Sequence, residues 1–205
     1  MDLTVFVAFF IVSVSLALTP GADWAYVITS GMKEKMLVPA IAGLALGYLM
    51  IAGVVAAGLG IVLSQIPFVL SMLIYCGAAY LIWVGLGAIK NPHVPYSGES
   101  MGNKSVKLIF LKGFAISGSN PKALLLFLAV LPQFTRPDAG WPSGIQMGVL
   151  GLLHTLDCCI VYTGVGLGSK AILRTRPSAA RKVGQFSVVA MIIIAALLIG
   201  KEILG

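Results

Sequence analysis

Long apolar runs, interrupted or bounded by glycine, proline or charged residues, organise this sequence. Their lengths and breakers predict helices near residues 3–31, 37–63, 67–89, 113–134, 144–169 and 184–200. Several runs approach the roughly 20 residues that a helix needs to cross a bilayer. The pattern therefore predicts an all-α integral membrane protein with six transmembrane helices, in which lipid rather than water surrounds most of the surface.

A polar stretch divides this pattern near its middle. Residues 91–107 are rich in Pro, Ser, Gly and Asn, which predicts a flexible loop between two halves of three helices each. We expect one transmembrane domain over residues 1–205, with a first repeat over about 1–90, a cytoplasmic loop over about 91–112 and a second repeat over about 113–205. An odd number of helices in each half gives the copies opposite orientations, the inverted repeat that is common among secondary transporters.

The two halves also share local features. In each first helix a polar residue followed by proline interrupts the apolar run, at Thr19-Pro20-Gly21 and at Asn120-Pro121. In each second helix glycines recur and the helix closes with Gly-Leu-Gly, at residues 58–60 and 166–168. Such glycines also allow helices to pack closely in lipid, so they support the repeat but indicate no chemistry.

Composition agrees with a membrane protein. Hydrophobic residues make up 59% of the chain, charged residues 10%, and the mean hydropathy is +1.00, which excludes an ordinary soluble domain. The segment Leu3 to Leu18 has no basic residue before it, so we interpret it as a retained helix rather than a signal peptide.

The net charge of +7 reflects membrane orientation rather than nucleic-acid binding. With the N-terminus on one side, that side receives only Arg136 and Lys201. The loops of the other side receive Lys33, Lys35, Lys90, Lys104, Lys107, Lys112, Lys170, Arg174, Arg176, Arg181 and Lys182. By the positive-inside rule the lysine-rich side is cytoplasmic, and both termini are expected outside.

The two breaks carry the first candidate chemistry. Thr or Asn followed by Pro is typical of a helix start, because the side chain caps free N–H groups and proline suits the first helical position. At ~1.5 Å per residue, each break lies about 20 Å from the far interface, near the middle of the membrane. Opposite orientations would turn both helix N-termini toward the centre, where they favour a carboxylate. A single break of this kind is also explained by a simple proline kink.

Three ionisable residues are expected deep in the membrane, namely Asp23, Lys122 and Asp157. Insertion of a charged side chain at the centre of a transmembrane helix costs on the order of 2.5–3.5 kcal/mol, so each of these residues is expected to have a specific role. The partial positive charges of two helix N-termini and the charge of Lys122 roughly balance the negative charges of the two carboxylates. A pocket with nearly zero net charge suits a zwitterion. Asp23 has a structural alternative, which is to cap its half-helix.

Asp157 follows His154 by three residues, so the two lie on one helical face at a spacing that allows a pair. A carboxylate in a medium of low dielectric can exchange protons near neutral pH, which makes Asp157 the first candidate for proton coupling. His154 has the alternative of a local hydrogen bond.

Tyr48, Tyr80 and Tyr162 either line a pathway or pack. The cysteines Cys76, Cys158 and Cys159 are expected to pack as small apolar residues.

Four motifs together resemble one known family. They are Thr19-Pro20-Gly21-Ala22-Asp23, the segment GAAYLIWVG at 77–85, Asn120-Pro121-Lys122-Ala123 and Leu131-Pro132-Gln133-Phe134. Their order and spacing over the whole chain resemble the LysE/RhtB amino-acid exporter family. The resemblance implies six helices in a bacterial inner membrane and proton-driven efflux of amino acids such as basic residues, threonine, homoserine, leucine or cysteine derivatives. The family usually has a second proline where this chain has Ala22.

We therefore expect a secondary active transporter, not an enzyme, that exports amino acids or similar small zwitterions without a metal or other cofactor. The expected substrate-binding residues are Thr19, Pro20, Gly21, Asp23, Ser119, Asn120, Pro121 and Lys122. The expected proton-coupling residues are Asp157, His154 and Asp23. The expected partners are the amino acid, protons and membrane lipid, with no nucleic acid, and the glycine faces permit a homodimer.

Three alternatives belong to other classes. A non-transporting membrane scaffold or channel would show no amino-acid counterflow. A metal exporter would need clustered ligands, and the chain offers only His93 and His154 as histidines. A membrane thiol-electron carrier would need a reactive cysteine in the first helix of each half, and neither helix has one.

Overall fold

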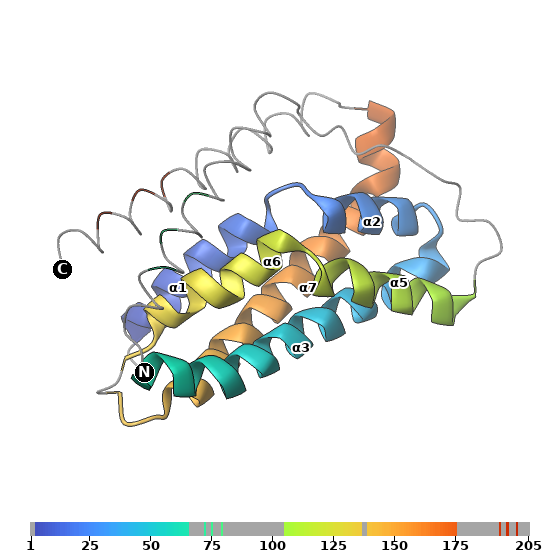
Figure 1. Cartoon of the computed structure of the whole chain (residues 1–205). Helices are drawn as coiled ribbons and strands as arrows, with labels where there is room; N and C mark the ends of the chain where they lie inside the picture. Colours follow the sequence, from blue (N-terminus) through green and yellow to red (C-terminus); the bar gives the residue numbers. More distant parts are fainter. Residues whose placement is uncertain are drawn as a thin grey trace.

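The computed structural model describes residues 3–65, 105–136 and 139–175, with single positions at 72, 75, 79, 193, 196 and 200. These ranges are helical (Figure 1) and contain α1 (Leu3–Ala17), α2 (Ala22–Gly31), α3 (Glu34–Gln65), α5 (Val106–Gly118), α6 (Pro121–Leu125), the π-helix η1 (Leu126–Val130), the 3-10 helix η2 (Leu131–Phe134) and α7 (Ser143–Thr175). The expected helices at 67–89 and 184–200, the central loop, Tyr80, Cys76 and His93 lie outside the described residues.

Two of the described helices are long and apolar enough to cross a membrane by themselves. They contain the candidate spans Lys35–Gly58 and Ser143–Ser169, with mean hydropathies of 2.2 and 1.5. Two further candidates are bent pairs, Leu3–Ala17 with Ala22–Gly31 at 65° and Val106–Gly118 with Lys122–Phe134 at 50°. The protein is thus a helical membrane protein with two to four candidate spans in its described part, and the two expected interruptions are both present.

The bend between α1 and α2 corrects one expectation. Thr19 does not cap α2, because α2 begins only at Ala22 and Gly21 occupies the cap position. The Thr19 hydroxyl instead donates to Ser15 O at 2.9 Å, a carbonyl near the C-terminal end of α1. The indole Nε1 of Trp24 also donates across the bend, to Ala17 O at 2.9 Å. The bend is therefore held by α1's free carbonyls, not by a hydroxyl cap on α2.

The second break has the expected cap. Asn120 precedes Pro121, the first residue of α6, and its Oδ1 accepts a hydrogen bond from the backbone N–H of Lys122 at 3.0 Å. After one turn the chain continues as η1 and η2 rather than as an α-helix. π-Helical turns inside a helix are frequent at functional sites, because they shift the side chains that follow.

Close helix contacts bring the two breaks together. α3 packs against α5 and α7, and α2 also packs against α7 (Figure 1). Gly43 of α3 and Gly113 of α5 allow their backbones to touch: a Cβ on Gly43 would lie 2.1 Å from Phe110 O, and one on Gly113 would lie 2.7 Å from Ala40 O. Gly43 thus has the packing role that the glycine spacing of its helix allowed.

Alanine at Gly43 is expected to destabilise the protein, because its methyl would overlap a backbone carbonyl that cannot rotate away. Overpacking of this kind costs about 1–3 kcal/mol and occasionally more. Gly53 in the same helix is a matched control, since nothing lies within 4 Å of a Cβ placed there. Thermal unfolding of purified protein in detergent should show a lower midpoint for G43A than for G53A. Equal midpoints would contradict the close approach of α3 and α5.

Candidate transport site

The two chain breaks contact each other directly. Asn120 of the second break donates from Nδ2 to Asp23 Oδ2 of the first break at 2.6 Å. Lys122 donates from Nζ to Thr19 O at 3.0 Å and to Leu16 O at 3.2 Å. A charged or polar group from each break is therefore bonded to the other, although about a hundred residues separate them in the chain.

Asp23 is fully buried and forms the centre of a polar cluster. Its Oδ2 accepts hydrogen bonds from Tyr48 OH at 2.8 Å, Tyr162 OH at 3.3 Å and Asn120 Nδ2 at 2.6 Å. The two phenol oxygens lie 3.1 Å apart. Its Oδ1 has no hydrogen-bond partner within the described part of the chain. We call Asp23, Tyr48, Asn120 and Tyr162 the Asp23 cluster, and its unpartnered oxygen is a vacant acceptor.

Lys122 supplies the positive charge beside this cluster. Its ammonium bonds to two backbone carbonyls where α1 ends, and no carboxylate among the described residues lies within ion-pair distance of it. The last carbonyls of a helix carry partial negative charge, so they stabilise the cation without neutralising it. A Cβ on Gly21 would lie 3.9 Å from Lys122 Nζ, at ordinary van der Waals distance, so Gly21 of the first break lies next to the ammonium.

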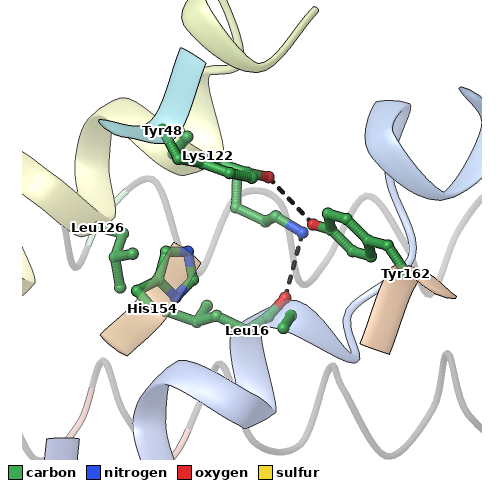
Figure 2. Close-up of a pocket in the computed structure, with 8 residues that line it drawn as sticks. Leu16, Tyr48, Lys122, Leu126, His154 and Tyr162 are labelled. Atoms are coloured by element: carbon green, nitrogen blue, oxygen red, sulfur yellow. Dashed lines mark hydrogen bonds between the residues drawn. The ribbon is translucent and has the colours of Figure 1, made fainter. Parts of the chain in front are cut away.

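A small cavity lies beside Lys122 and the two tyrosines of the Asp23 cluster (Figure 2). Its volume is about 10 Å³ and its lining consists of Leu16, Ala17, Tyr48, Lys122, Ala123, Leu126, His154 and Tyr162. Figure 2 shows the Lys122 side chain reaching past the tyrosine hydroxyls to the Leu16 carbonyl. The space is enough for about one water molecule. Binding of an amino acid would therefore require the surrounding helices to separate.

A second buried cluster joins α1 to α7. Ser13 Oγ lies 2.8 Å from His154 Nδ1 and donates to Asp157 Oδ2 at 2.6 Å. Cys158 Sγ lies 3.4 Å from His154 Nε2. Asp157 and His154 are linked through the Ser13 hydroxyl of another helix, which bonds to both. We call Ser13, His154, Asp157 and Cys158 the Ser13 cluster.

Both clusters contribute side chains to the lining of the cavity. His154 lines the cavity and its ring meets the Tyr48 ring edge-on, with centroids 5.5 Å apart. Phe127 packs edge-on against the same imidazole at 5.7 Å. Tyr48 in turn bonds to Asp23, so His154 and Asp23 contact opposite parts of one side chain. A change at either cluster therefore affects groups that the other cluster contacts.

The expected site residues are not all in the site. Asp23, Asn120 and Lys122 are brought together, and Thr19 takes part through its backbone carbonyl. Ser119 is exposed and its hydroxyl donates to Ala115 O of its own helix at 2.6 Å. Pro20 and Pro121 shape the breaks and donate no backbone N–H.

Sequence reasoning missed other members of the site. No sequence pattern singles out Ser13, and the sequence alone does not decide between a pathway and packing for Tyr48 and Tyr162. Each is nearly or fully buried and bonds to another buried polar group. The available signal was a hydroxyl near the middle of an apolar run, which must find a partner when no water reaches it.

A helical membrane protein with two broken spans that meet around buried charges belongs to the transporter class, because intramembrane ionisable residues and facing helix breaks mark pathways for polar solutes. The sequence matches the LysE type translocator family over residues 14–202, and the chain belongs to this family. Members of this family are transporters and not enzymes.

Curated relatives match most of the chain. A protein of Salmonella typhimurium named homoserine/homoserine lactone efflux protein is 30% identical, over 77% of this chain and 76% of its own length. A threonine efflux protein of Escherichia coli K12 is 25% identical, over 75% of this chain and 78% of its own. An uncharacterised membrane protein of Vibrio cholerae is 25% identical, over 83% of both chains. No solved structure matches the chain.

Proposed function

We propose that the protein exports amino acids or similar small zwitterions across the bacterial inner membrane, by alternating access around the cavity between the two breaks. The observation that carries this proposal is a buried carboxylate, Asp23, and a partly buried ammonium, Lys122, which lie on the two breaks beside a small cavity and are not paired with each other. The names of the Salmonella and Escherichia relatives, which refer to homoserine and threonine, make these the first substrates to test.

The charges suit both ends of an amino acid. The vacant Oδ1 of Asp23 is the acceptor we assign to the substrate ammonium. Lys122 Nζ, released from the Thr19 carbonyl, would meet the substrate carboxylate together with free N–H groups at the start of α2. A zwitterion would thereby meet both charges at once, whereas a ligand with only one charge would leave either Asp23 or Lys122 without an oppositely charged partner.

The finer architecture is part of this proposal. Six transmembrane helices in two inverted repeats would place α1–α2 in correspondence with α5–η2, and α3 with α7. Each bent pair is followed by a long apolar helix, which supports that correspondence. The distribution of lysine and arginine supports a cytoplasmic central loop, with both termini outside. The glycine faces are compatible with a homodimer.

Proton coupling is assigned to Asp157 and His154, with Asp23 as a second carboxylate. Burial of the Ser13 cluster supports this assignment, because Ser13, His154 and Asp157 are 0%, 4% and 5% exposed. An ionised carboxylate is costly in such surroundings, so proton uptake changes the energy of this part of the protein. Entry of a proton from outside would then be coupled to release of the amino acid there.

Counterflow in liposomes tests the function. Vesicles loaded with unlabelled homoserine or threonine should accumulate the labelled form above equilibrium when they contain the protein, because a carrier exchanges one molecule for another. Protein-free vesicles give the background, and a panel of the twenty amino acids with homoserine identifies the substrate. A scaffold would show no accumulation for any member of the panel, and a channel would only equilibrate the label.

A further inference from the structure

We propose that the Ser13 hydroxyl relays a proton between His154, at the cavity, and Asp157, one turn further along α7. The inference rests on the proposed function, because it describes how proton uptake reaches the transport site. Its basis is geometric: one hydroxyl from α1 lies 2.8 Å from His154 Nδ1 and 2.6 Å from Asp157 Oδ2.

The hydroxyl has one proton, and this fixes the direction of both hydrogen bonds. When Asp157 is a carboxylate, Ser13 donates to Asp157 Oδ2, and His154 must donate from Nδ1 to Ser13 Oγ. His154 Nε2 then carries no proton and is an acceptor, with Cys158 Sγ at 3.4 Å. In this state the His154 Nδ1–H and the Ser13 hydroxyl both donate in the direction from the cavity toward Asp157.

A proton that enters at His154 Nε2 reverses this order. The Nδ1 proton of His154 moves to Ser13 Oγ while the Ser13 proton moves to Asp157 Oδ2. One proton has entered, the imidazole is again neutral with its proton on Nε2, and Asp157 is a neutral acid. The net charge of the Ser13 cluster changes from −1 to 0, and no other reactant is needed. The reverse sequence returns the proton to the cavity.

The groups around the cluster connect this change to substrate binding. From the described elements, Tyr48 of α3 faces His154, and Lys122 lines the same cavity. Cys158 and Tyr162 belong to α7 itself, and Asp23 of α2 is one hydrogen bond away through Tyr48. An anionic Ser13 cluster favours a cation in the cavity, and a neutral cluster does not. A proton on the Ser13 cluster would thus weaken the attraction of the cavity for the substrate ammonium that Asp23 accepts.

Replacement of Ser13 tests the path. The probe is labelled homoserine or threonine, whichever the wild-type protein exchanges in liposomes. S13A should lower the ratio of transport driven by a pH gradient to counterflow at equal pH by about tenfold or more, because the bridge to a charged group is lost. S13T, which keeps the hydroxyl, should restore the ratio. Ser15 in the same helix is the matched control, since its hydroxyl donates only to Ile11 O at 2.7 Å.

Infrared spectroscopy gives a readout that needs no substrate. At acid pH the wild-type protein should show a carboxylic-acid C=O band that D157N removes, and S13A should shift this band whereas S15A should not. An unchanged ratio in S13A, an equal loss in S15A, or no rescue by folded S13T would overturn the relay. If no amino acid exchanges in the wild type, the proposed function fails, and an unshifted band in S13A then refutes the relay independently.

Discussion

Replacement of Asp23 by asparagine (D23N) is expected to raise the substrate concentration that half-saturates counterflow by about two to three orders of magnitude. Asn has nearly the same shape as Asp, and its amide oxygen still accepts from Tyr48 and Asn120, but it carries no charge for the substrate ammonium. Removal of one partner from a buried ion pair costs about 3–5 kcal/mol, and each 1.4 kcal/mol is a factor of about ten in affinity. Counterflow over a range of homoserine or threonine concentrations measures the effect.

Tyr26 provides the matched control for Asp23. It lies on the same helix and is buried, but its hydroxyl donates to Ile109 O of α5, away from the cavity. Y26F should therefore lower the thermal midpoint through loss of one hydrogen bond, about 1 kcal/mol, and leave the half-saturating concentration unchanged. If D23N folds and transports with wild-type affinity, Asp23 does not hold the ammonium.

Much of the site could be predicted because its signals are local. Proline lacks a backbone N–H and disfavours a continuous helix, so Pro20 and Pro121, each next to a polar residue inside an apolar run, marked both bends. Lys122 and Asp23 stand within a few residues of these prolines, and ionisable groups in lipid require partners. The meeting of the breaks was inferred from the proposed inverted orientation, and the Asn120–Asp23 hydrogen bond is in agreement with it.

The rest depends on how separate helices are rotated against each other, and the sequence does not give that. Ser13 looks like any small residue in an apolar helix until α1 packs on α7, where its partners are 141 and 144 residues away. Tyr48 and Tyr162 come from different helices and lie 25 and 139 residues from Asp23, the side chain that both contact. The prediction that Thr19 caps the second half-helix is wrong, because its sequence neighbours favour either helix end and only the start of α2 at Ala22 decides between them.

Replacement of Asp157 by asparagine (D157N) is expected to abolish transport driven by a pH gradient and to leave part of the exchange activity. Asn fits the space of Asp157 and can still bond to the Ser13 hydroxyl, but it cannot take up the proton that the cluster must store. Exchange of one amino acid for another requires no net proton movement, so its loss should be smaller. The measurement compares accumulation under an imposed pH gradient with counterflow at equal pH in the same vesicle preparation.

Thr155 supplies a control on the same helix that is as deeply buried as Asp157. Its hydroxyl donates to Gly151 O at 2.8 Å and contacts neither cluster, so T155V should keep the wild-type ratio of driven transport to exchange. Unchanged acid-driven accumulation in D157N would remove Asp157 from the mechanism. Asp23 would then have to serve both the substrate ammonium and the proton, and the D23N variant would lose exchange and driven transport together. The two variants thus distinguish a carrier with separate proton and substrate carboxylates from one in which a single carboxylate alternates between them.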